Sequence, residues 1–303
     1  MRSLSSRKQP LAQRRDGARR GFTLIELLVV IAVIAVLIGI MLPALSGARG
    51  AARQIREMAS GQQLMIAYTS YADAHRGYVL PGYPSRNMIN QGRITAYDRS
   101  GEAISFPTAS RYPWRLAPYM NYNFAGMYHR DASLEEMART SLPGNIDERY
   151  VVSLFPLYGL NSQYIGGNER FLAFNPTTER VFGRFYVRRL DEVRRPSGLL
   201  TFATARADRE TFASVGLSRE FPGHFDVWAP RFSESAGEQW ASTYDPRTPT
   251  PRENSGFVDL RHRGKALTAM FDGHVRALGW EELRDMRLWS DRAAKPDWAL
   301  GPR

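Results

Sequence analysis

The sequence predicts an α+β fold in which a long, kinked N-terminal helix packs on an antiparallel β-sheet domain. Three observations predict it. Residues 27–42 are all apolar, an amphipathic helical pattern continues from them to His75, and short β-rich runs with turn residues fill the C-terminal half. Sixteen helical residues are about 24 Å long, and their apolar neighbours extend this to the thickness of a bilayer. We therefore expect the first half of the helix to be transmembrane.

Charge and composition predict the orientation of the chain. The 303 residues carry a formal net charge of +11, about half of it in residues 1–21, and they include no cysteine. Positive charge beside an apolar helix holds that end in the cytoplasm. The residues after Leu45 are then outside the inner membrane and fold without disulfides. The remaining arginines are scattered along the chain, so we expect no nucleic-acid partner.

The start of the apolar run has a distinctive composition. Gly21 is followed by Phe22-Thr23-Leu24-Ile25-Glu26 and then by the uninterrupted apolar helix. This pattern resembles the N-terminal motif of type IV prepilins and of the pseudopilins of type II secretion systems. The resemblance implies that a prepilin peptidase cuts after Gly21 and methylates Phe22. Residues 1–21 would then be a leader, and residues 22–45 a transmembrane and assembly helix.

Glu26 is the one charged residue inside the apolar stretch. A carboxylate there is costly unless a partner neutralises it. The N-terminal ammonium of a neighbouring subunit is such a partner in a bundle of parallel helices, so we interpret Glu26 as a residue that sets the assembly register. The alternative is a signal peptide or a plain anchor that happens to contain an acid.

The helix is expected to continue through residues 46–76. Pro43 should kink it, and Gly77 supplies a stop. The predicted apolar face comprises Leu45, Ala48, Ala52, Ile55, Ala59, Ile66 and Ala72. The segment from Tyr71 to Pro81 resembles the transition from helix to domain in a large bacterial group of pilin-like proteins.

Residues 77–303 are expected to form the exported, β-rich domain. Phe182 to Leu190 and Leu199 to Ala205 are β-rich runs, and Asp131 to Thr140 reads as a short helix with Ser133 as its N-cap. Tyrosine and tryptophan are frequent. They are expected mainly in the core, and the alternative is a carbohydrate-binding face.

Residues 257–278 contain His262, nine further residues and then Asp272-Gly273. This resembles the H-X9-DG segment of a prepilin-like group known as DUF1559, a resemblance that assigns the motif no role. Asp-Gly favours a two-residue hairpin turn, which would pair Phe271 with His274. Arg263-Gly264 would make a second tight turn, so that residues 266–271 form the central strand of a meander.

This register separates His262 from Asp272 by the length of a strand, on the order of 20 Å. A shared metal site or a catalytic pair is then excluded. The alternative, in which His262, Asp272 and His274 are metal ligands, requires a wider first turn.

No common catalytic or cofactor-binding motif is present. We therefore expect no enzymatic activity, no cofactor and no assigned metal site. Calcium stays open, because pseudopilins of the family resembled here bind it in a C-terminal loop. Asp226, Asp245 and Asp259 lie in or beside an irregular region, but their spacing is not that of an EF-hand.

The predicted function is structural. The chain would be a subunit of a type IV pilus-like or type II pseudopilus-like filament, with a prepilin peptidase and other pilin-like subunits, identical or different, as partners. It would be a single-pass protein of the inner membrane with a periplasmic or cell-surface domain, and part of a filament after processing. The alternative is a membrane-anchored binding protein for glycans that uses the prepilin signal only for export. The sequence does not separate a major pilin from a minor pilin or a pseudopilin.

Overall fold

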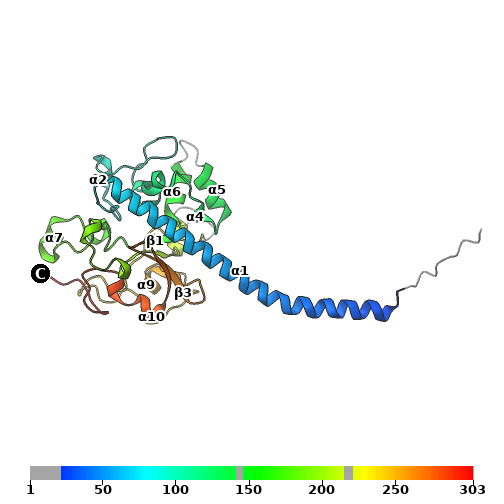
Figure 1. Ribbon diagram of the computed structural model, residues 1–303. Coiled ribbons are helices and arrows are strands. Elements are labelled where there is room, and N and C mark those ends of the chain that lie inside the picture. Colours follow the sequence, from blue (N-terminus) through cyan, green and yellow to red (C-terminus); the bar gives the residue numbers. More distant parts are fainter. Residues whose placement is uncertain (1–21, 141–145, 215–220, 303) are drawn as a thin grey trace, which may run out of the picture. The chain divides into compact units, whose positions relative to one another are not determined.

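The computed structural model describes residues 22–140, 146–214 and 221–302, and the chain divides into two compact units at Gly50 and Ala51. Gly21 and the rest of the leader lie outside the described residues. The first unit consists of the N-terminal half of helix α1 (Leu24–Ala74), and the second contains the rest of α1, the sheet and all the smaller helices (Figure 1).

Helix α1 ends where the sequence predicts. Arg76 and Gly77 both have positive φ, of 57° and 81°, and the Gly77 N–H donates to the Ala72 carbonyl at 2.8 Å. This closes the last turn in the manner of a glycine C-cap. Pro43 lies inside α1. Because proline has no N–H to donate to the Gly39 carbonyl, this turn lacks one backbone hydrogen bond. A bend at Pro43 stays a prediction.

The sheet has four antiparallel strands in the order β1-β2-β3-β4, namely Tyr158–Leu160, Leu200–Thr204, Lys265–Met270 and Val275–Gly279. Leu160 pairs with Phe202, Ala203 with Thr268, and Ala269 with Val275. The predicted α+β class, with a long helix and an antiparallel sheet, is confirmed. The central strand β3 is also the predicted one, but its second neighbour is β2 and not the segment before His262.

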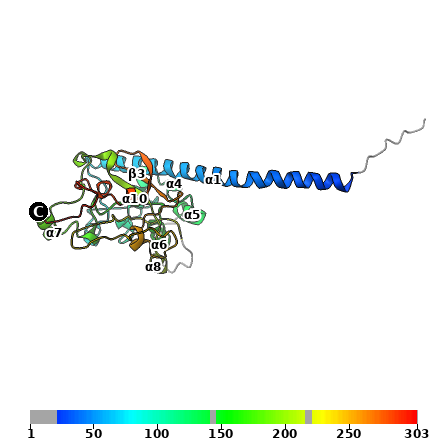
Figure 2. The same ribbon diagram turned by 90° about the horizontal axis from the view of Figure 1, so that it is seen from below.

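Both faces of the sheet are buried. Leu267 and Ala269 of β3 join a cluster with Tyr68 of α1, while Ala266 and Met270 join a second cluster with Trp289. This is the alternation that a two-sided sheet requires. Residues 51–74 of α1 therefore cover one face, and the C-terminal segment covers the other (Figures 1 and 2).

The buried face of α1 differs from the predicted one. It comprises Glu57, Ser60, Gly61, Leu64, Met65, Ala67, Tyr68, Tyr71 and Ala72, whereas Ile55 and Ile66 are each 67% exposed. Ala72 is buried as predicted, but the prediction was wrong for Ile55 and Ile66, because it followed alanine and isoleucine although aromatic side chains contact the sheet. Tyr68 meets Phe202 edge to face, with ring centroids 5.7 Å apart.

Short helices occupy most of the remaining chain. They are α2 Arg86–Asn90, α3 Tyr112–Leu116, α4 Ala125–Tyr128, α5 Ala132–Thr140, α6 Ile146–Leu154, α7 Pro176–Phe182, α8 Arg209–Ser214, α9 Pro251–Ser255 and α10 Trp280–Leu283. Single 3-10 turns are η1 Thr108–Ser110, η2 Ala117–Met120, η3 Glu169–Phe171, η4 Leu190–Glu192, η5 Pro196–Gly198 and η6 Met286–Leu288.

Two local predictions need correction. The first residue of α5 is preceded by Asp131, whose Oδ1 accepts from the backbone N–H of Ser133 and Leu134, so Asp131 and not Ser133 caps the helix. The run from Phe182 to Leu190 is not a strand. Gly183 ends α7, and Val187 then pairs only with the irregular segment around Ile165.

Candidate functional site

The N-terminal candidate site begins at Phe22, which is 74% exposed and directly precedes the capped start of α1. The Thr23 N–H and the Thr23 hydroxyl both donate to Glu26 Oε2 at 2.8 Å, and the Glu26 N–H donates to Thr23 Oγ1 at 3.2 Å. This reciprocal arrangement is a capping box. The sequence signal for it, threonine followed three residues later by glutamate, was present but not used in the prediction.

The capping box leaves half of the Glu26 carboxylate available. Both hydrogen bonds go to Oε2, and Oε1 accepts none from the described residues. The same side chain can therefore cap its own helix through one oxygen and receive a cation through the other.

The apolar side chains that follow are not covered. From Leu24 to Leu42 the exposed fractions of the large apolar residues lie between 45% and 86%. Of the helices that the structure describes, α1 is the one long and apolar enough to cross a membrane. A continuous apolar helix surface of this length requires lipid or other apolar helices around it.

The second candidate segment, around His262, is a hairpin with two turns. His262 and Lys265 exchange backbone hydrogen bonds of 3.0 and 3.1 Å around Arg263-Gly264, both with positive φ, so the predicted Arg263-Gly264 turn is confirmed. The turn at Asp272-Gly273 differs by one residue from the prediction. Ala269 pairs with Val275, and the Met270 N–H donates to the His274 carbonyl.

The register at Asp272-Gly273 follows from the neighbouring strand. The Phe271 N–H donates to the Leu199 carbonyl at 2.8 Å, so Phe271 continues the pairing with β2 and is unavailable to His274. The loop thus contains three residues, and only Gly273 in it has positive φ, at 93°. Asp272 Oδ1 accepts from His274 Nδ1 at 2.6 Å, which holds the loop from its exposed side.

His262 is positioned by its turn against helix α1. Its side chain is 8% exposed, and its Nε2 lies 2.9 Å from Oε2 of Glu57, which is fully buried. Arg130 donates through Nε to the other carboxylate oxygen, and the hydroxyl of Tyr158 donates to the Glu57 carbonyl at 2.7 Å. The sequence analysis missed this cluster because it placed Glu57 away from the packed face.

The Glu57 cluster favours the ionised carboxylate. Burial by itself would raise the pKa of Glu57, but the hydrogen bond from His262 and the positive charges of Arg261 and Arg130 lower that pKa to about 2. The arrangement is an ion-pair network between the helix and the hairpin. All the partners of the carboxylate are side chains of the fold, so we interpret the network as one that stabilises the packing of the hairpin against α1.

The predicted ligands of the open metal hypotheses lie in different networks. His262 contacts Glu57, whereas Asp272 contacts His274. Asp259 lies 2.9 Å from the Arg261 guanidinium, Asp245 accepts from the Arg247 N–H, and Asp226 is buried. Within the described ranges, no three His, Asp or Glu side chains are close enough to share a metal ion.

Asp226 belongs to a buried polar network. Ser162 Oγ and Trp228 Nε1 donate to its two carboxylate oxygens, and Asn168 Nδ2 lies 3.2 Å from Oδ2. Burial nevertheless raises the pKa of Asp226 to about 6, because those hydrogen bonds offset only part of the lost hydration.

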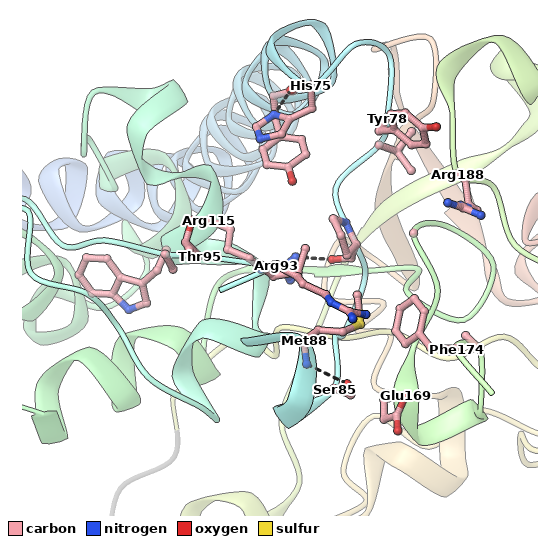
Figure 3. Close-up of a pocket in the computed structure, with 18 of the residues that line it drawn as sticks. His75, Tyr78, Ser85, Met88, Arg93, Thr95, Arg115, Glu169, Phe174 and Arg188 are labelled. Carbon is pink, nitrogen blue, oxygen red and sulfur yellow. Dashed lines mark hydrogen bonds between the residues drawn. The ribbon is translucent and has the colours of Figure 1, made fainter. Parts of the chain in front are cut away.

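A large pocket opens beside the C-terminal end of α1 (Figure 3). Its volume is about 1140 Å³, and it is lined by residues of α1, α2, α3 and α7 and of the segments that join them. His75 stacks on Tyr71 at 3.9 Å, and Arg93 reaches into the middle of the pocket (Figure 3). The sequence analysis expected the aromatic residues mainly in the core and did not locate this pocket.

One comparison with known proteins gives a match. The family model of the prokaryotic N-terminal methylation motif matches residues 17–42, a segment that includes Gly21, Phe22 and Glu26. The chain therefore carries a type IV pilin-type signal, which supports a prepilin-type protein that is processed and exported. No curated protein and no solved structure matches the chain. The resemblance of residues 257–278 to the DUF1559 group stays a prediction.

Proposed function

We propose that this protein is a structural, non-catalytic subunit of a type IV pilus-like or type II pseudopilus-like filament that needs no cofactor. The observation that carries the proposal is the methylation motif at residues 17–42. The exposed apolar surface of α1 supports it, since helices with such a surface pack against one another in a filament once they leave the bilayer. A prepilin peptidase would cut after Gly21 and methylate Phe22.

Mass spectrometry tests the processing step. The full chain is expressed with and without a prepilin peptidase in the same host, and its intact mass and N-terminus are measured. We expect a chain that begins at methylated Phe22 only when the peptidase is present. Gly21→Trp should leave the precursor uncut, whereas Gly17→Trp, in the same leader, should be processed. An uncut wild-type chain would contradict the proposal.

A second candidate function is a membrane-anchored binding protein that uses the prepilin-type signal for export. The observation that favours it is the pocket of about 1140 Å³ beside the end of α1, whose lining includes several tyrosines and arginines. A purely structural subunit has no need of a pocket of this size. The two functions are compatible, because a filament can carry a binding site on each subunit.

A further inference from the structure

The pocket beside α1 carries an excess of positive charge. Its lining includes Arg76, Arg93, Arg115 and Arg188 but only two carboxylates, Glu169 and Glu179. Within the described part of the chain, neither Arg93 nor Arg188 forms an ion pair. Arg188 lies over the ring of Tyr78, with 5.9 Å between guanidinium and ring centroid.

Arg115 adds a buried charge to the pocket wall. Its side chain is 3% exposed, and its guanidinium donates to the carbonyls of Pro81, Gly82 and Ser110. Burial lowers the pKa of Arg115 to about 10, so the group is still charged at neutral pH. No described carboxylate pairs with it, so Arg115 adds net positive charge to the wall of the pocket.

The other lining groups suit a sugar. Tyr78 is 44% exposed, and Tyr119 and Tyr186 are partly exposed at the same pocket. Because Arg188 and Arg189 lie over the Tyr78 ring, at 5.9 and 5.1 Å from its centroid, Tyr119 and Tyr186 are the rings that present a flat apolar face beside a hydroxyl, as a pyranose requires. Ser85, Asn87 and Gln91 supply further polar groups. His75 Nδ1 lies 2.7 Å from the Tyr71 carbonyl, and none of the described residues bonds its Nε2, which can therefore bond a ligand.

We propose that this pocket binds an oligosaccharide that carries carboxylates, with Arg93 and Arg188 as the groups that bind the carboxylates. The volume of the pocket, the flat aromatic groups and the unpaired guanidinium groups all point to this class. The inference rests on the second candidate function and specifies its ligand. An acidic peptide would share the charge but would not use the exposed ring faces.

Isothermal titration of the full chain in detergent tests the proposal. The probes are trigalacturonate, its fully methyl-esterified form, which has the same length but no charge, and hexaglutamate. We expect saturable binding of trigalacturonate that weakens with salt. Arg93→Gln and Arg188→Gln should each weaken it by about tenfold, the typical effect of one charge-assisted hydrogen bond. Arg247→Gln, an exposed arginine outside the pocket, is the matched control and should leave it unchanged.

A variant of opposite sign makes the test stricter. Glu169 lines the same pocket and is exposed, so Glu169→Gln should strengthen trigalacturonate binding a few fold by removing a repulsion. Equal binding of the esterified sugar would overturn the carboxylate assignment but keep a glycan site, and equal binding of hexaglutamate would overturn the sugar. No binding of any probe would overturn this inference, and the second candidate would then be tested separately with neutral and basic glycans. Processing is read separately by mass, so none of these results decides the filament proposal.

Discussion

His262 Nε2 and Glu57 Oε2 form a buried hydrogen bond of 2.9 Å although 205 residues separate the two in the chain. The pair joins the turn before β3 to helix α1, and so connects the strand at the centre of the sheet to the helix that covers it. His262 thus has a structural role in this fold, independent of Asp272 at the other end of β3.

Removal of the Glu57 charge should destabilise the second unit. In Glu57→Gln, His262, Arg130 and Arg261 lose the carboxylate that they share, and we expect the free energy of unfolding to fall by about 3 kcal/mol. Urea denaturation of the full chain in detergent, followed by tryptophan fluorescence, measures this. Glu281→Gln, at an exposed glutamate, is the control and should change stability by less than about 0.5 kcal/mol. An equally small effect for both variants would mean that the pair adds nothing to stability.

The same pair predicts an acid limb of stability. The pKa of Glu57 is about 2 in the fold against an ordinary value of 4.5. Because the folded pKa is depressed, the stabilisation is fully present above pH 4.5 and is lost as the pH falls towards 2. The difference in stability between wild type and Glu57→Gln should therefore shrink over this window. A difference that stays constant from pH 5 to 2 would contradict the assignment.

The raised pKa of Asp226 predicts that stability changes with pH in the opposite direction. Its pKa is raised from 3.8 to about 6, so between these values the unfolded chain has lost a proton that the folded chain retains. Stability should then decrease from about pH 4 to 6, by about 3 kcal/mol. Asp226→Asn cannot ionise and should abolish this decrease, while the acid limb from Glu57 persists as an internal control. A decrease of the same size in the variant would assign it to another group.

Gly61 should resist substitution because α1 approaches β1 closely there. A Cβ at Gly61 would lie 2.9 Å from the Tyr158 hydroxyl and 3.2 Å from Val275 Cγ2. The Tyr158 ring would have to move away from the Glu57 carbonyl. We therefore expect Gly61→Ala to lower the free energy of unfolding by about 1 kcal/mol, even though alanine favours a helix. Gly50→Ala, in the same helix but with no atom within 4 Å, should be neutral or stabilising. The reverse order of the two variants would show that the contact is loose.

Glu26 caps helix α1 through Thr23, and in the proposed filament it also binds a cation. Glu26→Gln can still accept from Thr23 but has no charge, whereas Glu26→Ala loses both functions. If the carboxylate pairs with the Phe22 ammonium of a neighbour, both variants should be processed and both should assemble poorly, with roughly tenfold less filament. Filament yield is measured in the sheared surface fraction of a host with the assembly machinery. Wild-type yield from Glu26→Gln alone would assign the residue to capping.

The sequence predicted the parts of the fold that local patterns determine. The apolar run, the stop at Gly77, strand β2 and the Arg263-Gly264 turn each depend on a few adjacent residues. The face of α1 could not be predicted in the same way, because Glu57 is buried only in the presence of Arg130 and His262. The one-residue change in the second turn has the same cause, since the Phe271 N–H is bound by Leu199.

The two candidate sites differ in the same way: one depends on adjacent residues and the other on residues that the fold brings together. The processing motif was predicted from six consecutive residues, and its match to the methylation family agrees with that prediction. The pocket gathers residues from Tyr71 to Arg188, and apart from the segment from Tyr71 to Pro81 they come from places in the chain that share no motif. Spacing along the chain carries no information about such a site. The signal in the sequence was the frequency of tyrosine and tryptophan, which left a carbohydrate-binding face as an alternative but did not locate it.

The dependence of Glu57 on His262 imposes an order on the biogenesis of the protein. Ribosomal synthesis and export deliver Glu57 first, and its carboxylate has no histidine partner until more than two hundred further residues have followed. Strand β3 arrives at the same moment, since it begins three residues after His262. The domain therefore completes its fold only after residue 270 has been synthesised. A chain truncated before residue 262 would leave Glu57 without its histidine partner and the sheet without its central strand.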